Sequence, residues 1–291
     1  MQFISDYKSE TTLRLGFNSL AQRVFGIDFE QWYQLGCWND DYICYSFADG
    51  ERIVANVSIN KMKLLLDGRI CHALQLATVM TDPEYRNRGL CRKLLETALA
   101  HHESAHEFTY LYANASVQDY YPRFGFAQKR LTRITAKAET AGFMRHPVRQ
   151  LDIRNPRDWE LIRKLTAERT APSSRCAVLN GDNIFAWYCL NEFPQELYYL
   201  EDQEILVVCR KTGDTLLLLD VVSRRGVGIS DFIGSFAEGD QVHIEFDFTP
   251  GFADIVPVAE TLELRQTDLF FMKPSSALLP EGCRLPLTAR T

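Results

Sequence analysis

The sequence predicts an α+β protein in which mostly antiparallel strands are flanked by amphipathic helices. Two Asp-Gly pairs, Asp49-Gly50 and Asp67-Gly68, each lie between runs rich in apolar and β-branched residues, a pattern typical of tight hairpins. After the second hairpin, a helix is predicted to begin near Arg88 because apolar side chains recur there at helical spacing. At 291 residues, the chain is long enough for two such units.

The first half of the chain contains these predicted elements in order. Helical faces are expected within residues 9–35, two hairpins within 41–80, a buried strand over 108–113 and a further strand over 128–135. The buried face of the helix that begins near Arg88 is formed by Leu90, Leu94, Leu95, Ala98, Leu99 and His102.

The second half repeats this order in a weaker form. Residues 136–150 show no clear period and contain a glycine and a proline, so we place a boundary there. Asn155 and Pro156 then supply an N-cap and the first residue of a helix. Two strands follow that are joined at Gly213-Asp214, and further strands are expected over 242–248 and 268–273.

These observations divide the chain into two domains and a tail. The first domain spans residues 1–140, the second spans 150–275, and residues 276–291 form a loosely ordered tail or docking arm. Each half contains a strand that ends at a turn with Arg and Gly, at 74–91 and at 216–228. This similarity between the two halves favours a duplication, although two unrelated α+β units would share some of the same order of helices and strands.

The overall composition is that of an ordinary globular protein, with 46% hydrophobic and 24% charged residues. No secretory signal or membrane span is readable, so we expect a cytoplasmic protein without a membrane partner. No basic stripe accumulates, which argues against nucleic acid. The eight cysteines form no Cys-x-x-Cys pair and no zinc-ligand spacing, so neither a disulfide framework nor a metal site is expected.

Residues 86–91, Arg-Asn-Arg-Gly-Leu-Cys, place two arginines and a glycine where a strand passes into a helix. The first N–H groups of a helix are unpaired, glycine allows close approach of the backbone, and arginine adds charge-assisted hydrogen bonds. The turn therefore predicts a phosphate-bearing ligand. The alternative is a solvated helix start with two surface arginines, and the pattern is neither a P-loop nor a dinucleotide fingerprint.

The same turn resembles the acyl-CoA pyrophosphate loop of the GNAT N-acetyltransferase superfamily, Gln/Arg-x-x-Gly-x-Gly/Ala. Arg86 begins the pattern, Gly89 is its first glycine, and Cys91 replaces the final small residue. Residues 114–126, NASVQDYYPRFGF, resemble the family's downstream segment Asn-x-x-Ala-x-x-x-Tyr-x-x-x-Gly-Phe, with valine in the alanine position. The resemblance covers roughly residues 40–135. It implies the GNAT fold, a mixed and mostly antiparallel sheet flanked by helices, with acetyl-CoA as acyl donor.

The resemblance also implies roles for individual residues. Backbone N–H groups near Val79 would face the thioester carbonyl and stabilise its developing negative charge. Tyr121 would be the general acid, since a phenol keeps its proton at neutral pH, or it would simply pack among aromatic residues. Asn114 would bond the pantetheine arm or a water, or serve as a turn residue. The pyrophosphate would be held by the backbone amides of Arg86, Asn87, Arg88, Gly89, Leu90 and Cys91.

The general base is left open. His72 and Gln75 lie on the strand that leads to the site, where the family sometimes carries a glutamate, and Asp119 lies close by in sequence. Each also has an ordinary structural role as a packed or solvated residue. The thiol of Cys91, at a helix start beside two arginines, is expected to have a lowered pKa.

The corresponding turn in the second half departs from the family pattern. Ser223 stands where Gln or Arg belongs, and Asp247 occupies the tyrosine position. We therefore expect a degenerate GNAT-like lobe that completes the substrate cleft or forms the interface of a homo-oligomer; the alternative is an unrelated α+β lid.

The sequence as a whole predicts a GNAT-type N-acyltransferase that moves an acetyl or short acyl group from acyl-CoA to a primary amine by direct transfer. The alternative is a catalytically idle acyl-CoA-binding module for sensing or interaction. Residues 146–291 hold 15 basic and 22 acidic residues, which favours a cationic acceptor such as a polyamine, an aminoglycoside or a peptide amine.

Overall fold

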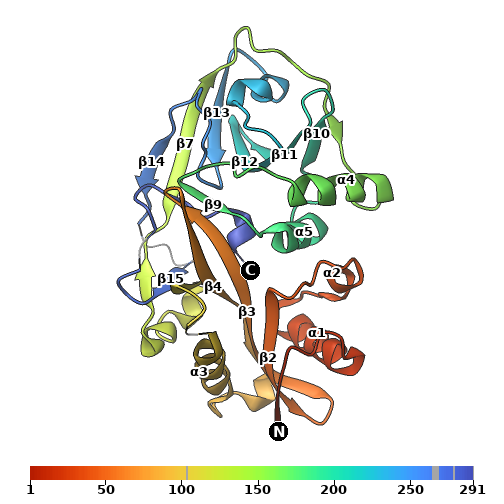
Figure 1. Ribbon diagram of the computed structural model, residues 1–291, viewed down its shortest axis with the longest axis vertical. Coiled ribbons are helices and arrows are strands. Elements are labelled where there is room, and N and C mark those ends of the chain that lie inside the picture. The colour runs from red at the N-terminus through yellow and green to blue at the C-terminus, as the bar shows by residue number, and fades with distance from the viewer. Residues whose placement is uncertain (103, 264–268, 278, 291) are drawn as a thin grey trace.

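Two mixed β-sheets, one in each half of the molecule, form the framework of the protein (Figure 1). The structure is a computed structural model that describes residues 1–102, 104–263, 269–277 and 279–290. None of the helices within these ranges is both long enough and apolar enough to cross a lipid bilayer.

The first sheet has the strand order β1-β2-β3-β4-β5-β15-β6, and β9 pairs with β3 beside this path. Its strands are β1 (Gln2–Ser5), β2 (Tyr42–Asp49), β3 (Arg52–Leu66), β4 (Arg69–Thr81), β5 (Phe108–Ala113), β6 (Ala127–Lys129), β9 (Cys176–Val178) and β15 (Leu269–Lys273).

The second sheet has the order β8-β10-β11-β12-β13-β7-β14. Its strands are β7 (Thr132–Glu139), β8 (Arg149–Gln150), β10 (Leu197–Leu200), β11 (Ile205–Thr212), β12 (Thr215–Val222), β13 (Gln241–Phe246) and β14 (Val258–Thr261).

The two sheets match each other strand by strand. In each, three antiparallel pairings lead to one parallel pair, β4 with β5 and β12 with β13. Two further antiparallel pairings complete each sheet. One strand of each sheet comes from the other half of the chain. In the first sheet, β15 from the second half lies between β5 and β6. In the second sheet, β7 from the first half lies between β13 and β14. Each sheet is therefore completed by the other half of the chain.

The helices are α1 (Thr11–Phe25), α2 (Glu30–Gln34), α3 (Leu90–His102), α4 (Pro156–Ala167) and α5 (Asp182–Asn191). Short 3₁₀ helices are η1 (Pro83–Tyr85), η2 (Ala115–Val117), η3 (Tyr121–Phe124), η4 (Ile229–Asp231), η5 (Ile233–Ser235) and η6 (Leu287–Ala289).

Helices α1 and α3 cover opposite faces of the first sheet (Figure 1). From α3, Leu90 and Leu94 pack with Leu76 of β4 in one core, whereas Phe17 and Leu20 of α1 belong to a separate core. Burial of each such side chain contributes roughly 1.5–3 kcal/mol. In the second half, α4 and α5 pack on one face of the sheet, and η4 and η5 pack on the other.

Several sequence predictions are confirmed. The hairpins turn at Gly50 and Gly68, both with positive φ, and the helix predicted from Arg88 is α3. The helix capped by Asn155 is α4, in which the Asn155 side chain accepts a hydrogen bond from the Arg157 amide.

One expectation about the chain is wrong, and a second is right about the strand but not about the sheet to which it belongs. The strand expected over 128–135 is broken at Arg130, and its two pieces, β6 and β7, belong to different sheets. The strand expected over 268–273 is β15 in the first sheet, with residue 268 outside the described residues.

The C-terminal segment is not loosely ordered where the structure describes it. Cys283, Leu285 and Ala289 are buried, and the Tyr110 hydroxyl donates to the Ala289 carbonyl at 2.9 Å. Its apolar side chains share a core with the first sheet, so this segment packs as part of the fold.

Candidate functional site

Strands β4 and β5 are parallel neighbours that pair only along a short stretch. Their Cα partners run from Ala73 and Phe108 to Gln75 and Tyr110, and the described residues of the two strands form no pair beyond this point. Both strands nevertheless continue. They therefore separate, and the backbone groups on their facing edges are open to an extended ligand.

A β-bulge interrupts β4 where the strands separate. The pairing of β3 with β4 shifts register between Asn56 and Ser58, so that Thr78 and Val79 together oppose a single residue of β3. Thr78 has a φ of 38°, in the left-handed region that a β-branched residue rarely adopts. A bulge removes a residue from the ladder, which leaves its backbone N–H available to a ligand.

Asp82 fixes the chain immediately after β4. Its carboxylate accepts hydrogen bonds from the Glu84 amide at 3.2 Å, from Arg23 at 3.0 Å and from Arg52 at 2.7 Å. Burial alone would raise the pKa of this carboxyl, but the hydrogen bonds from Arg52 and Glu84 outweigh burial and lower it. Asp82 is therefore an ionised anchor that links α1, β3 and the turn.

The residues after this anchor form an exposed turn that leads into α3. Asn87 and Gly89 have φ values of 62° and 71°. A Cβ on Gly89 would meet no neighbour, so backbone conformation, and not lack of space, favours glycine here. Because α3 begins at Leu90, its first N–H groups are oriented toward this turn.

The two arginines of the turn are exposed, and both brace its backbone. Arg88 donates to the Glu84 carbonyl at 2.9 Å, and its guanidinium lies 4.8 Å from the ring centre of Tyr85. Arg86 donates to the Thr81 carbonyl at 3.4 Å. Of the residues predicted to hold pyrophosphate, Arg86, Asn87, Arg88 and Gly89 thus lie in one exposed turn that carries two positive charges. Leu90 is buried and Cys91 is half-buried at the start of α3.

The predicted lowering of the Cys91 thiol pKa is wrong. The thiol lies 2.9 Å from the Thr81 hydroxyl and donates to the Met80 carbonyl at 3.3 Å, so it faces the strands and not the turn. Burial raises its pKa, because desolvation of a thiolate among carbonyl oxygens outweighs the favourable field of the helix.

Tyr121 lies in η3 and is buried against strand residues of the first sheet. Its ring contacts those of Tyr120, Phe126 and Phe271, the last of which belongs to the exchanged strand β15. The Tyr121 hydroxyl forms no hydrogen bond with the described residues, and burial raises the pKa of the phenol above its ordinary value. The side chain is therefore protonated at neutral pH.

Asn114 caps η2. Its side-chain oxygen accepts hydrogen bonds from the amide and the hydroxyl of Ser116, as expected of a turn residue. The residue is exposed at the end of β5, where the strands have separated.

Of the three candidates for a general base, none stands out in the structure. His72 is exposed near the start of β4, and Asp119 is exposed between η2 and η3. Gln75 is fully buried and neither side-chain polar atom has a hydrogen-bond partner among the described residues, but an amide does not titrate in the physiological range.

Sequence reasoning missed a group of buried polar side chains behind the bulge. Tyr42, Asn56, Ser58 and Thr78 are joined there by hydrogen bonds. Polar residues at alternate positions of β3 were a visible signal. Such alternation is typical of a solvent-facing edge, whereas the structure buries these residues.

The corresponding turn of the second half already holds an anion of the chain itself. The Asp254 carboxylate accepts hydrogen bonds from the amides of Ile229 and Ser230 at 2.8 and 2.9 Å, and from the Ser230 hydroxyl at 2.6 Å. A Cβ on Gly228 would lie 2.6 Å from this carboxylate, so glycine is needed for the close approach.

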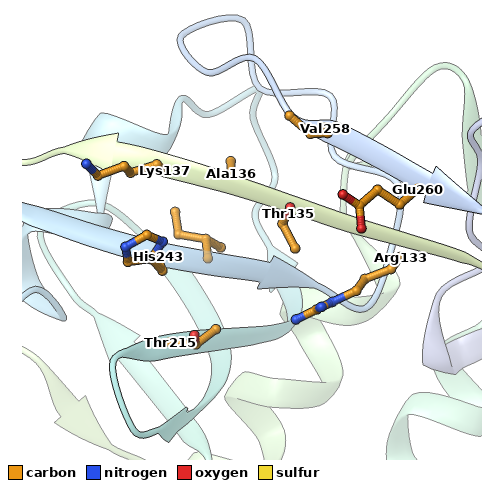
Figure 2. Close-up of a pocket in the computed structure, with 9 residues that line it drawn as sticks. Arg133, Thr135, Ala136, Lys137, Thr215, His243, Val258 and Glu260 are labelled. Atoms are coloured by element: carbon orange, nitrogen blue, oxygen red, sulfur yellow. The ribbon is translucent and has the colours of Figure 1, made fainter. Parts of the chain in front are cut away.

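A separate hollow of about 390 Å³ lies on the second sheet (Figure 2). It is lined by Arg133, Thr135, Ala136, Lys137, Thr215, His243, Ile244, Val258 and Glu260. None of the residues predicted for the acyl-CoA site lines it, and the Arg133 guanidinium is paired with Glu245 at 2.7 Å. Across the described ranges, no group of three or more His, Cys, Asp or Glu could hold a metal ion.

Comparison with known proteins matches the first half of the chain to a family. Residues 13–128 match the family model described as "Acetyltransferase (GNAT) domain". A search of the curated proteins finds no match. Residues 13–128 thus match a GNAT acetyltransferase domain, and the fold is α+β as predicted.

Several solved structures share the fold over nearly the whole chain. A GCN5-related N-acetyltransferase from Kribbella flavida is 17% identical, with a TM-score of 0.52 over 93% of this chain and 71% of that one. One from Anabaena variabilis is 16% identical, with a TM-score of 0.53 over 94% and 73%. Eis1 from Mycobacterium abscessus is 12% identical, with a TM-score of 0.54 over 93% and 73%.

Proposed function

We propose that the protein is an N-acyltransferase that moves an acetyl or short acyl group from acyl-CoA to a primary amine. The observation that carries this proposal is the alignment of two features along β4. The strand separates from β5 at a bulge, and it ends at an arginine-bearing turn in front of α3. An acyl-CoA has the matching order of groups, with a thioester at one end of the pantetheine arm and a pyrophosphate at the other.

In this proposal, the pyrophosphate binds the backbone amides of residues 86–91, and the side chains of Arg86 and Arg88 add positive charge. The pantetheine arm lies between β4 and β5 and passes Asn114. The backbone N–H groups near Val79 receive the thioester oxygen. This arrangement places the thioester carbon beside the bulge for attack by an amine.

The reaction is a direct transfer. The amine lone pair forms a C–N bond to the thioester carbon, the oxyanion is stabilised near Val79, and the C–S bond then breaks. The departing thiolate receives a proton from the Tyr121 hydroxyl, and the amine nitrogen loses one proton. The tyrosinate then regains a proton, because the proton released by the nitrogen returns to it directly or through solvent, which restores the starting state.

The second half is proposed to be a duplicated lobe that no longer binds acyl-CoA. Its strand order and strand directions support the duplication. The carboxylate of Asp254 supports the loss of binding, because it occupies the amides that a phosphate would need. The eight cysteines are free thiols, which supports a reducing compartment such as the cytoplasm.

The first test is calorimetric titration of acetyl-CoA into the wild-type protein and into the double variant Arg86→Ala, Gly89→Glu. The variant removes one guanidinium, places a carboxylate at the turn and strains a residue whose φ is 71°. We expect binding by the wild type and at least a tenfold weaker association for the variant, in line with the loss of ionic hydrogen bonds worth about 1.5–3 kcal/mol.

The matched control is the double variant Arg130→Ala, Gly142→Glu, which makes the same chemical changes at an exposed arginine and at an open glycine with a φ of 83°. It should bind acetyl-CoA as the wild type does. A folded wild type that does not bind acetyl-CoA would contradict the proposal. Binding without transfer to any amine in a thiol-release screen would favour the sensing module.

A further inference from the structure

The bulge in β4 is held from behind by a buried hydrogen-bond network. The Asn56 amide nitrogen lies 2.9 Å from the Thr78 carbonyl, 3.2 Å from the Thr78 hydroxyl and 2.9 Å from the Ser58 hydroxyl. The Tyr42 hydroxyl lies 2.8 Å from the Thr78 hydroxyl. Asn56 and Ser58 are 0% exposed and Tyr42 is 1% exposed, whereas Thr78 is half-buried, so each bond to Thr78 is shielded from water on the side of its partner.

The other end of the Asn56 side chain is also engaged. Its oxygen accepts a hydrogen bond from the Ser46 hydroxyl at 2.8 Å, and Ser46 in turn lies 2.6 Å from the Tyr7 hydroxyl. The carboxamide therefore accepts on the side of Ser46 and donates on the side of Thr78. Both functions are needed at one position, and a carboxamide supplies both, whereas an ionised carboxylate only accepts hydrogen bonds.

The network acts on the residue whose backbone is strained. Among the non-glycine residues with positive φ that the structure describes, Thr78 alone is β-branched. Such a conformation costs on the order of 1–3 kcal/mol and persists only where the surroundings hold it. The contacts of Asn56 with both the carbonyl and the hydroxyl of Thr78 fix the peptide between Thr78 and Val79.

We propose that Asn56 is a positioning residue that holds the Thr78–Val79 peptide so that its amide is directed at the thioester carbonyl. This inference rests on the proposed function and deepens it. The Val79 amide would be an oxyanion donor only while the carbonyl of Thr78 is held on the opposite side of the same peptide, because the N–H and C=O of a trans peptide point in opposite directions. Asn56 binds that carbonyl directly.

The test measures the hydrogen bond to the carbonyl itself. Acetyl-CoA labelled with ¹³C at its carbonyl carbon is bound to wild type, to Asn56→Asp and to Tyr42→Phe, and the carbonyl stretch is recorded by isotope-edited infrared spectroscopy. In the wild type, we expect the band to move to lower wavenumber on binding. In Asn56→Asp, most of this shift should be lost, and Tyr42→Phe, which removes a single hydroxyl, should lose a smaller part.

Binding of CoA and turnover give the second readout. CoA lacks the thioester carbonyl, so its affinity should change less than about threefold in the Asn56→Asp variant. The kcat with an accepted amine should fall about 10²-fold, close to the effect of losing one oxyanion donor. Replacing Thr78 by glycine in the Asn56→Asp background should recover part of kcat, because glycine adopts a positive φ without a partner.

The matched control is Asn60→Asp. Asn60 lies on the same strand, is 1% exposed and bonds to Met62 and Asn183 instead of the bulge. It should retain the infrared shift and kcat. If the Asn56 variant does not fold, Tyr42→Phe provides the decisive comparison with wild type.

The possible failures are distinguishable. A wild type that does not bind acetyl-CoA overturns the proposed function and this inference with it. If acetyl-CoA binds and the band shifts equally in wild type and in the Asn56 and Tyr42 variants, the proposed function stands and the positioning role is wrong.

Discussion

At the scale of single residues, the buried phenol of Tyr121 raises a question of proton energetics. An unperturbed tyrosine has a pKa of about 10 and an unperturbed thiol about 8.5, and burial raises that of Tyr121 further. Full transfer of its proton to a thiolate is therefore uphill. The hydroxyl can still stabilise the departing sulfur by a hydrogen bond, and return of the proton that the attacking nitrogen releases completes the cycle.

We predict that Tyr121→Phe lowers kcat by about 10²-fold and changes the affinity for CoA by less than about twofold, since general acid catalysis contributes 10²–10⁴-fold. Steady-state kinetics and calorimetry measure the two quantities. Tyr120→Phe is the matched control, because Tyr120 is the adjacent, half-buried phenol, whose pKa burial raises to about 12. A loss confined to Tyr120→Phe would assign the role to Tyr120, and an unchanged kcat in both variants would contradict a general-acid role for either phenol.

At the scale of elements, Asp82 connects three segments to the phosphate turn. Its pKa is lowered, so its pairing with Arg23 and Arg52 stabilises the fold above the unfolded pKa of about 3.9 and is lost as pH falls through the lower folded value. We predict that Asp82→Asn is destabilised by roughly 1–3 kcal/mol at pH 7, and that this difference narrows below about pH 4.

Chemical unfolding of wild type and Asp82→Asn between pH 3 and pH 8 measures this difference, with Glu84→Gln as the control. Glu84 contacts Arg52 at 2.7 Å but is 70% exposed in its side chain, so its loss should cost little at any pH. A difference between wild type and Asp82→Asn that stays constant down to pH 3 would contradict the role of the ionised carboxylate.

At the scale of the whole molecule, the exchanged strands join the stabilities of the two halves. Without β15, the edges of β5 and β6 that it covers lose their hydrogen-bond partners. We predict that residues 1–140 alone do not form a folded unit, and that the full chain unfolds in one transition. Circular dichroism and calorimetry check the two statements.

A synthetic peptide of residues 269–277 supplies the control for this prediction, since it provides β15 without the rest of the second half. Added to residues 1–140, it should increase the folded signal, and a peptide of the same composition in scrambled order should not. A stable fragment 1–140 without the peptide would show that the exchanged strand is dispensable.

The features of the fold that the sequence predicts are those set by residues close together in the chain. The hairpins at Gly50 and Gly68, the face of α3 and the turn around Gly89 follow from turn residues and periodicity, which act over a few residues. The exchange of β7 and β15 depends on pairings across more than a hundred residues, which no local pattern specifies.

The same distinction applies to the candidate site. The sequence proposes the turn of residues 86–91 and the segment of Tyr121 as site residues, because short motifs carry them. It did not indicate Asn56, whose partners Ser46 and Thr78 lie on the two neighbouring strands, and it misjudged Cys91 because the direction of the thiol decides its pKa. Burial and side-chain direction are properties of the folded sheet, and they decide these two cases.

The carboxylate of Asp254 has a consequence for the stability of the turn that it occupies. A turn that binds an external anion is stabilised only when that anion is present. The stabilisation is about 2.7 kcal/mol when the ligand concentration is one hundred times the dissociation constant. A turn that carries its own carboxylate is independent of supply. The turn of the second half therefore keeps its conformation without a ligand.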